Sequence, residues 1–176
     1  KMIELEKTYL IKELPDLTNC KYKEMLDIYI PKAINHAPIR IRKNGEEYEL
    51  TKKELPSDGD PSKLIEQTIN LTKEEFDSLE KEISGRRVHK KRYLFDYDGR
   101  VAEIDVFKDE LDGLVLVDFE FEKEEEQEAF EMPEFCLIDI TVEEFIAGGM
   151  LCGKNYSDIE ADLDRFNYKK IDTKLL

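Results

Sequence analysis

The stretch KKRYLFDYDGRVAEIDVF, residues 90–107, decides how this chain folds. Polar and apolar residues alternate on both sides of Asp98-Gly99, which is typical of two half-buried strands. Asp-Gly between such runs predicts a hairpin, because both residues of the turn need a positive φ. Asn44-Gly45 predicts a second hairpin, formed by residues 39–43 and 47–53. Since a hairpin joins antiparallel neighbours, an antiparallel sheet is expected.

Other segments complete this pattern of strands and helices. Further strands are expected at residues 3–11, 65–71 and 114–122, with a short one near 135–139. Helices are expected over residues 19–30, ending at Pro31, and over the acidic residues 122–131, with one face in solvent. Three capping-box sequences predict helix starts, at Thr72–Glu75, Thr141–Glu144 and Ser157–Glu160. A mobile loop is expected at residues 55–62.

These elements predict an α+β fold in a single domain. Strands dominate, so the sheet is expected to be curled or closed, with several helices packed on it. A length of 176 residues fits one domain, and neither an internal repeat nor a domain boundary is visible. The C-terminal residues 155–176 are expected to be a helical segment of the same domain, 1–176.

Composition limits the function classes. There are 42 acidic and 27 basic residues, a net charge of −15, and this charge disfavours a general nucleic-acid or anionic-membrane binder. The longest uncharged stretch, residues 145–153, is far shorter than the roughly 20 residues of a membrane span. Cys20, Cys136 and Cys152 are widely separated, which suits a reducing compartment, so a cytoplasmic protein is expected.

Charged residues two positions apart recur inside the predicted strands. Because alternate side chains of a strand share a face, pairs such as Arg40 and Arg42, or Glu103 and Asp105, lie on one face. Like charges on one strand are unfavourable unless opposite charges lie across from them. A solvated outer face is the ordinary alternative. If the helices cover the apolar face instead, the charged face becomes the concave inside of a barrel.

The charged face would suit a polyphosphate. Its five cations, which match phosphate oxygens, are Arg40, Arg42, Lys53, Lys90 and Arg92. Its seven carboxylates are Glu4, Glu6, Glu66, Glu103, Asp105, Asp118 and Glu120. Carboxylate oxygens are ligands for Mg²⁺ or Mn²⁺. Two divalent cations would reverse the net negative charge of the face, so the pattern predicts metal-dependent polyphosphate binding.

The order of these charged strands resembles the CYTH superfamily, the triphosphate tunnel metalloenzymes. The segments that carry the resemblance are Glu4–Leu10 (ExExK), Ile39–Arg42 (RxR), Tyr48–Lys53 (LTxK), Glu66–Ile69 (ExE), Lys90–Tyr93 (KxRY), Glu103–Phe107 (ExDxF), Gly113–Glu120 (GLxxxExE) and Asp139–Thr141 (ExT). Positions that depart from the pattern include Thr8, which replaces the lysine of ExExK, Thr68, which replaces a glutamate, and Asp118, which replaces another. The resemblance spans about residues 3–151.

The resemblance implies an eight-stranded antiparallel barrel that forms a tunnel, with a charged interior and helices outside. It implies a metal-dependent triphosphatase, with inorganic tripolyphosphate as the leading substrate. Glu4 and Glu6 would be catalytic and, with Asp118 and Glu120, would hold Mg²⁺ or Mn²⁺. The five cations would bind the phosphates. Glu66, Glu103 and Asp105 would hold a second ion or orient the cations, and structural salt bridges are their alternative.

Other functions stay open at this point. Thr8 motivates a polyphosphate- or nucleotide-binding module with weak or no turnover. Thiamine-triphosphatase, adenylyl cyclase and a scaffolding protein are further alternatives. The expected partner is a small-molecule polyphosphate or nucleoside triphosphate, with neither nucleic acid nor membrane, and a homodimer is left open.

Overall fold

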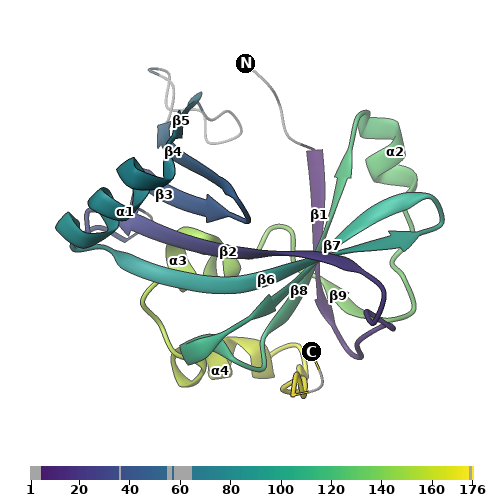
Figure 1. The fold of residues 1–176 in the computed structure, drawn as a ribbon. Helices are drawn as coiled ribbons and strands as arrows, with labels where there is room; N and C mark the ends of the chain where they lie inside the picture. Colours follow the sequence, from purple (N-terminus) through teal and green to yellow (C-terminus); the bar gives the residue numbers. More distant parts are fainter. Residues whose placement is uncertain (1–4, 36, 55–56, 58–64, 175) are drawn as a thin grey trace. The chain divides into compact units, whose positions relative to one another are not determined.

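The computed structural model describes residues 5–35, 37–54, 57, 65–174 and 176. Figure 1 shows the fold, which is α+β with a nine-stranded sheet of order β5-β4-β3-β2-β6-β7-β8-β1-β9. The strands are β1 (Leu5–Ile11), β2 (Lys21–Ile30), β3 (Ile39–Asn44), β4 (Glu47–Glu54), β5 (Ile65–Leu71), β6 (Arg86–Tyr97), β7 (Arg100–Phe107), β8 (Val115–Phe121) and β9 (Cys136–Asp139). The helices are α1 (Lys73–Glu82), α2 (Glu124–Ala129), α3 (Gly148–Leu151) and α4 (Tyr156–Asp164), and short 3-10 turns lie at Asp109–Leu111 and Glu144–Ile146.

The chain forms two compact units, and each is built from separate segments. Unit 1 takes its described residues from 24–89 and 146–153. Unit 2 takes its described residues from 5–23, 90–145 and 154–176. The strands β2 and β6 therefore contribute residues to both units.

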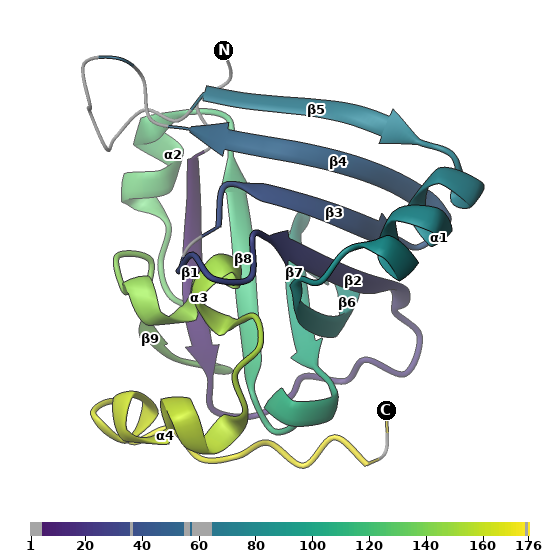
Figure 2. The same cartoon turned by 90° about the vertical axis from the view of Figure 1, so that its left-hand side faces the viewer.

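Unit 1 has an apolar sheet face covered by α1 and a charged face on the other side. Figure 2 shows β5, β4 and β3 side by side, with α1 near one end of these strands. Phe76 of α1 packs on Ile28, Ile41 and Tyr48. Strand alternation turns the neighbours of these residues to the opposite face. Within unit 1, the expectation that a helix covers the apolar face is confirmed.

The start of α1 was predicted correctly. Thr72 Oγ1 accepts a hydrogen bond from the Glu75 backbone N–H at 3.2 Å, and the Thr72 backbone N–H donates to Glu75 Oε2 at 2.8 Å. This is a complete capping box, which satisfies two amides that the helix itself cannot satisfy. It fixes where the chain leaves β5 and begins the helix that covers unit 1.

Unit 2 has its own core, formed by the apolar sides of β1, β7 and β8. Its buried residues include Tyr9, Ile104, Val117 and Phe119. Figure 2 shows α2 beside β1 and β8, and Phe130, just after α2, packs against Phe119 with 4.6 Å between ring centroids. The alternate residues of the same strands carry the charged side chains.

The prediction of a helix over residues 19–30 is wrong, because most of this segment is strand β2. Tyr22, Leu26 and Tyr29 have helical spacing, but Leu26, Ile28 and Ile30 also alternate. Pairing with β3 decides between the two patterns, since Ile28 lies opposite Ile41 in the antiparallel register. The packing of the sheet therefore overrides a weak helical pattern.

Two of the predicted helix starts also differ from the structure. Thr141 caps no helix: its hydroxyl donates to Asp139 Oδ1 at 2.6 Å and accepts from the Thr8 backbone N–H at 3.0 Å. The helix predicted to start at Ser157 starts two residues earlier, because Asn155 is the N-cap and Asp158 completes the capping box. Ser, Asn and Asp side chains can all cap, so residue type alone did not choose among them.

The predicted barrel of eight strands is corrected to nine strands in an open order. The extra strand is β2, and the order ends at β5 and β9 without a closing pair in the described part of the chain. The loop predicted at 55–62 lies almost wholly outside the described residues. None of the helices in the described ranges is long and apolar enough to cross a membrane.

Candidate functional site

The register of unit 2 places polar residues of three neighbouring strands, β7, β8 and β1, on one face. Glu103 of β7 lies opposite Asp118 of β8, and Asp118 lies opposite Thr8 of β1. One step along the same face, Glu120 lies opposite Glu6. Because paired residues of neighbouring strands share a face, these side chains form a single row across the sheet.

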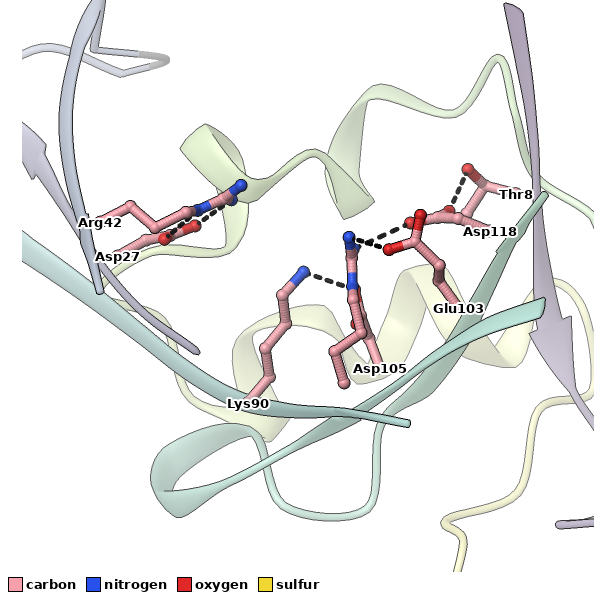
Figure 3. A network of polar contacts seen from close by, with 8 residues as sticks. Thr8, Asp27, Arg42, Lys90, Glu103, Asp105 and Asp118 are labelled. Carbon is pink, nitrogen blue, oxygen red and sulfur yellow. Dashed lines mark hydrogen bonds and ion pairs between the residues drawn. The ribbon is translucent and has the colours of Figure 1, made fainter. Parts of the chain in front are cut away.

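Arg92 of β6 is the centre of this cluster. Its Nε donates to Asp105 Oδ1 at 2.7 Å and its Nη2 donates to Asp105 Oδ2 at 2.8 Å. Its Nη1 pairs with Glu103, and its Nη2 reaches Asp118 Oδ2 at 3.4 Å. Lys90 pairs with the same Asp105 carboxylate. Figure 3 shows Lys90, Glu103, Asp105 and Asp118 with these contacts as dashed lines.

The cluster shifts the pKa values of its carboxyl groups in opposite directions. Burial opposes the ionisation of Asp105, but Lys90 and Arg92 outweigh it and lower the pKa of Asp105 to about 2. Burial, together with the charge of Asp105, raises the pKa of Asp118 to about 6. Lys90, Arg92 and the Thr8 hydroxyl oppose that rise, and Thr8 Oγ1 donates to Asp118 Oδ1 at 2.7 Å.

Unit 2 holds more negative charge on this face than its cations neutralise. Burial raises the pKa of Glu103, and the Glu120 and Asp105 charges raise it further, against Arg92. Burial and the neighbouring carboxylates therefore favour the neutral form of Glu103 more than an exposed site would.

This donor set fits a divalent cation in its chemistry. Carboxylate oxygens in excess are what Mg²⁺ or Mn²⁺ binds, and a cation would relieve the repulsion between Glu6 and Glu120 across the strands. As placed, no three His, Cys, Asp or Glu side chains of the described residues converge closely enough to hold an ion. Binding would have to draw these carboxylates together or recruit a ligand outside the described part.

Unit 1 carries the second charged face. On this face, Arg42 of β3 is held by two hydrogen bonds to one carboxylate. Arg42 Nε donates to Asp27 Oδ1 at 2.6 Å, and Arg42 Nη2 donates to Asp27 Oδ2 at 2.7 Å. Figure 3 shows this pair as two parallel dashed lines. Asp27 comes from β2 and lies directly opposite Arg42 in the register. Such a bidentate pair fixes both the position and the plane of the guanidinium group.

Arg40 lies on the same face as Arg42 with weaker partners. Its Nη2 lies 3.5 Å from Glu49 Oε1, and its buried Nε has no hydrogen-bond partner among the residues that the structure describes. A buried donor without a partner costs roughly 1–3 kcal/mol, and a phosphate oxygen could satisfy it. The next strands add the Lys53–Glu66 ion pair at 2.9 Å.

Comparisons with known proteins identify the family of this chain. No protein-family model matches the chain. An inorganic triphosphatase of Nitrosomonas europaea is 33% identical over 133 residues, which are 75% of this chain and 85% of the relative. The chain belongs to the CYTH superfamily. A crystal structure of an inorganic triphosphatase matches with a TM-score of 0.67 at 26% identity, covering 88% of this chain and 97% of the other. Another, described as a hypothetical protein, matches with a TM-score of 0.67 at 27% identity, covering 86% and 99%.

The CYTH motif residues that the sequence predicted fall into the two units. Unit 2 brings together Glu6, Lys90, Arg92, Glu103, Asp105, Asp118 and Glu120. Unit 1 brings together Arg40, Arg42, Lys53 and Glu66. Glu4 lies outside the described residues. Glu66, Glu103 and Asp105 each pair with a cation, as the salt-bridge alternative expects.

Sequence reasoning missed Asp27, although it binds a CYTH motif arginine. The segment around it was predicted to be a helix, so its side chain was not assigned to the charged face. The alternation of Leu26, Ile28 and Ile30 was the signal that could have found it, because it places Asp27 on the polar side of a strand.

Proposed function

We propose that this protein hydrolyses a phosphoanhydride bond of a triphosphate, with inorganic tripolyphosphate as the leading substrate and Mg²⁺ or Mn²⁺ as the cofactor. The family relationship to an inorganic triphosphatase supports this reaction class. The observation that carries the proposal is the ionic cluster around Arg92, where cations and excess carboxylates share one face of unit 2.

The cations are proposed to bind the phosphates. Arg40, Arg42, Lys53, Lys90 and Arg92 would offset the negative charge of the substrate and the charge that develops on the leaving phosphate oxygens. Arg40 has the clearest reason to bind an anion, because its buried Nε lacks a partner in the described part of the chain. Asp105 holds Lys90 and Arg92 in place on β6 before substrate arrives, so these cations need little reorganisation.

The carboxylates are proposed to hold the divalent cation. Glu4, Glu6, Asp118 and Glu120 are the proposed ligands, with Glu4 and Glu6 the catalytic residues, and Glu66, Glu103 and Asp105 either serve a second ion or orient the cations. A bound divalent cation would polarise phosphate oxygens and help to activate water. The Thr8 hydroxyl orients Asp118 by its hydrogen bond at 2.7 Å.

A phosphate-release panel tests the proposal. Tripolyphosphate, thiamine triphosphate, ATP and pyrophosphate, each with Mg²⁺ and with Mn²⁺, should show release that is fastest from tripolyphosphate and abolished by a chelator. An ATP arm that yields cyclic product would instead indicate an adenylyl cyclase. Fastest release from thiamine triphosphate would indicate a thiamine-triphosphatase, and release from none of the four would refute the assignment.

Substitution of Arg42 tests the role of the cations. Arg42→Ala should reduce triphosphatase turnover at least roughly tenfold, on the usual effect of removing one electrostatic contact. Arg87→Ala is the matched control, because Arg87 is an exposed arginine of unit 1 that pairs with Glu80, and it should keep the activity of the unsubstituted protein. Equal activity of the two variants would contradict a role for Arg42 in substrate binding.

A polyphosphate-binding module with little turnover is the second candidate. Thr8 favours it, because this hydroxyl stands where the family motif has a lysine and is bonded to Asp118. Calorimetry with tripolyphosphate, run beside the release assay, separates the two functions. Binding without phosphate release would indicate the module.

A further inference from the structure

Asp27 of β2 is a buried carboxylate, which is unusual for a charged residue. Only 2% of it is exposed, and burial of a carboxylate is unfavourable unless the charge is paired. Its partner Arg42 is itself mostly buried, with 17% of its side chain exposed. A buried ion pair is weak evidence for stability, because apolar residues of similar size often stabilise a fold as well. The placement of this pair therefore suggests a role other than stability.

The ion pair with Asp27 restrains the guanidinium of Arg42 more tightly than that of Arg40 is restrained. Two hydrogen bonds, of 2.6 and 2.7 Å, join the Nε and Nη2 edge of Arg42 to both oxygens of Asp27. Arg40, two residues away on β3, has a longer ion pair, with 3.5 Å between its Nη2 and Glu49 Oε1. A fork with two parallel hydrogen bonds sets the plane of the guanidinium, which a single contact does not.

We propose that Asp27 is a positioning residue that fixes the Arg42 guanidinium in the orientation in which it binds phosphate oxygens. This inference rests on the proposed function, since it concerns how a phosphate-binding arginine is oriented. Electrostatic stabilisation is effective when the donor is oriented before the reaction, because then no reorganisation is needed. Asp27 acts through Arg42 and does not itself contact the substrate.

A double-substitution cycle tests the proposal with Asp27→Asn and Arg42→Lys. Asparagine keeps the size of Asp27 but loses the charge and one acceptor, whereas lysine keeps the charge of Arg42 but loses the fork. Asp27→Asn alone should lower kcat/KM for tripolyphosphate at least roughly tenfold. In the Arg42→Lys background the same change should have less than about a twofold effect, because no fork remains to be oriented.

Asp27→Glu distinguishes positioning from simple charge pairing. Glutamate keeps the charge but is one methylene longer, so a positioning role predicts a loss of kcat/KM close to that of Asp27→Asn. Activity of Asp27→Glu equal to that of the unsubstituted protein would overturn the proposal. Asp77→Asn is the matched control, because Asp77 forms an exposed ion pair with Lys73 on α1, and it should leave kcat/KM unchanged.

The outcomes separate this inference from the proposed function. If the unsubstituted protein releases phosphate and the two substitutions are additive, the inference is wrong and the function stands. If the protein binds tripolyphosphate in calorimetry but releases no phosphate, the proposed hydrolysis is wrong. The double-substitution cycle is then measured as changes in the Kd for tripolyphosphate. If it neither binds nor releases, both are wrong. Circular dichroism confirms folding at the assay temperature, and Asp27→Glu decides the question if Asp27→Asn is unfolded.

Discussion

Asp105 and Asp118 contact the same arginine, yet their pKa values are shifted in opposite directions. Asp105 accepts two hydrogen bonds from Arg92 and pairs with Lys90, so its charge is matched. Among the described residues, Asp118 accepts hydrogen bonds from the Nη2 of Arg92, at 3.4 Å, and from the Thr8 hydroxyl. The pKa of the first is about 2 and that of the second about 6. Fixed partners, rather than burial alone, decide which carboxylate keeps a proton.

The pKa of Asp118 predicts how its removal changes stability with pH. Because this pKa is about 6 in the folded chain and ordinarily 3.8, the folded protein loses stability as Asp118 ionises. Asp118→Asn should therefore gain stability relative to the unsubstituted protein as the pH rises from about 4 to 7. The gain should approach roughly 3 kcal/mol, since one pKa unit corresponds to about 1.4 kcal/mol. Urea denaturation in a chelating buffer measures it.

Asp105→Asn is the contrasting variant, because the pKa of Asp105 is lowered. Asp105 contributes stability that is present above its ordinary pKa of 3.8 and is lost as the pH falls toward 2. Asp105→Asn should therefore be less stable than the unsubstituted protein at neutral pH, and the deficit should shrink in acid. A stability difference that is independent of pH in both variants would contradict these assignments.

The spacing of charged residues predicted which side chains share a strand face but not how they pair. Lys90, Arg92 and Asp105 were recognised because they lie two apart within clear strands. The pairing of Arg42 with Asp27 could not be read, because it depends on a strand that looked like a helix. Which side chains pair depends on the register between neighbouring strands. That register can be predicted from sequence only where the hairpin turns are unambiguous.

At the scale of elements, Gly85 determines how closely β2 can approach the segment between α1 and β6. A Cβ atom at Gly85 would lie 2.4 Å from Ile28 Cγ2 and 2.8 Å from the carbonyl oxygen of Tyr29. The second contact is with backbone, which cannot turn away as a flexible side chain would. Gly85→Ala would therefore have to displace β2.

The stability of Gly85→Ala tests this close approach. The substitution should cost roughly 1–3 kcal/mol in the free energy of unfolding, as expected for overpacking. Ser84→Ala, at the neighbouring exposed position, should stay within about 0.5 kcal/mol of the unsubstituted protein. Urea denaturation monitored by circular dichroism measures both, and equal stabilities would show that the segment relaxes without cost.

Strands were easier to predict than helix starts. Eight of the nine strands follow from alternation and from the Asn-Gly and Asp-Gly turns. The capping boxes at Thr141 and Ser157 were wrong because several neighbouring side chains can cap equally well. Thr141 shows the competing interaction, since it accepts from the backbone of Thr8 on β1. A local motif gives way where a tertiary contact needs the same hydroxyl.

At the scale of the whole molecule, the net charge of −15 repels a polyanion, so we expect the proposed polyphosphate binding to require cations. Mg²⁺ and tripolyphosphate together should raise the melting temperature, whereas tripolyphosphate with a chelator should not. At a concentration of about 100 Kd a ligand stabilises by about 2.7 kcal/mol, which corresponds to a rise of roughly 5 °C or more for a chain of this size. Differential scanning fluorimetry measures the shift.

Matched variants make this shift informative. Glu120 is one of the carboxylates on the charged face of unit 2. Glu120→Gln should therefore reduce the rise in melting temperature produced by Mg²⁺ with tripolyphosphate. Glu160→Gln, an exposed residue of α4, should not change it. An equal shift in both variants would place the cation elsewhere.

The closure of the sheet could not be predicted from alternation. Alternation specifies which side chains share a face, but it carries no information on whether the first and last strands of a sheet meet. The family resemblance supplied that expectation, whereas the observed order is open, from β5 to β9. Sequence therefore predicted the class of the fold and the residues of the charged faces, but not the number of strands or their closure.

Because the segments of the two units alternate along the chain, neither unit can be produced alone by simple truncation. The chain changes unit after Lys23, His89, Phe145 and Gly153. No uninterrupted piece of the gene therefore encodes either unit, and a deletion meant to remove one would also sever β2 or β6. Separating the acidic cluster from the arginines of β3 would call for rejoined segments with new linkers, as in a circular permutant, rather than for truncation.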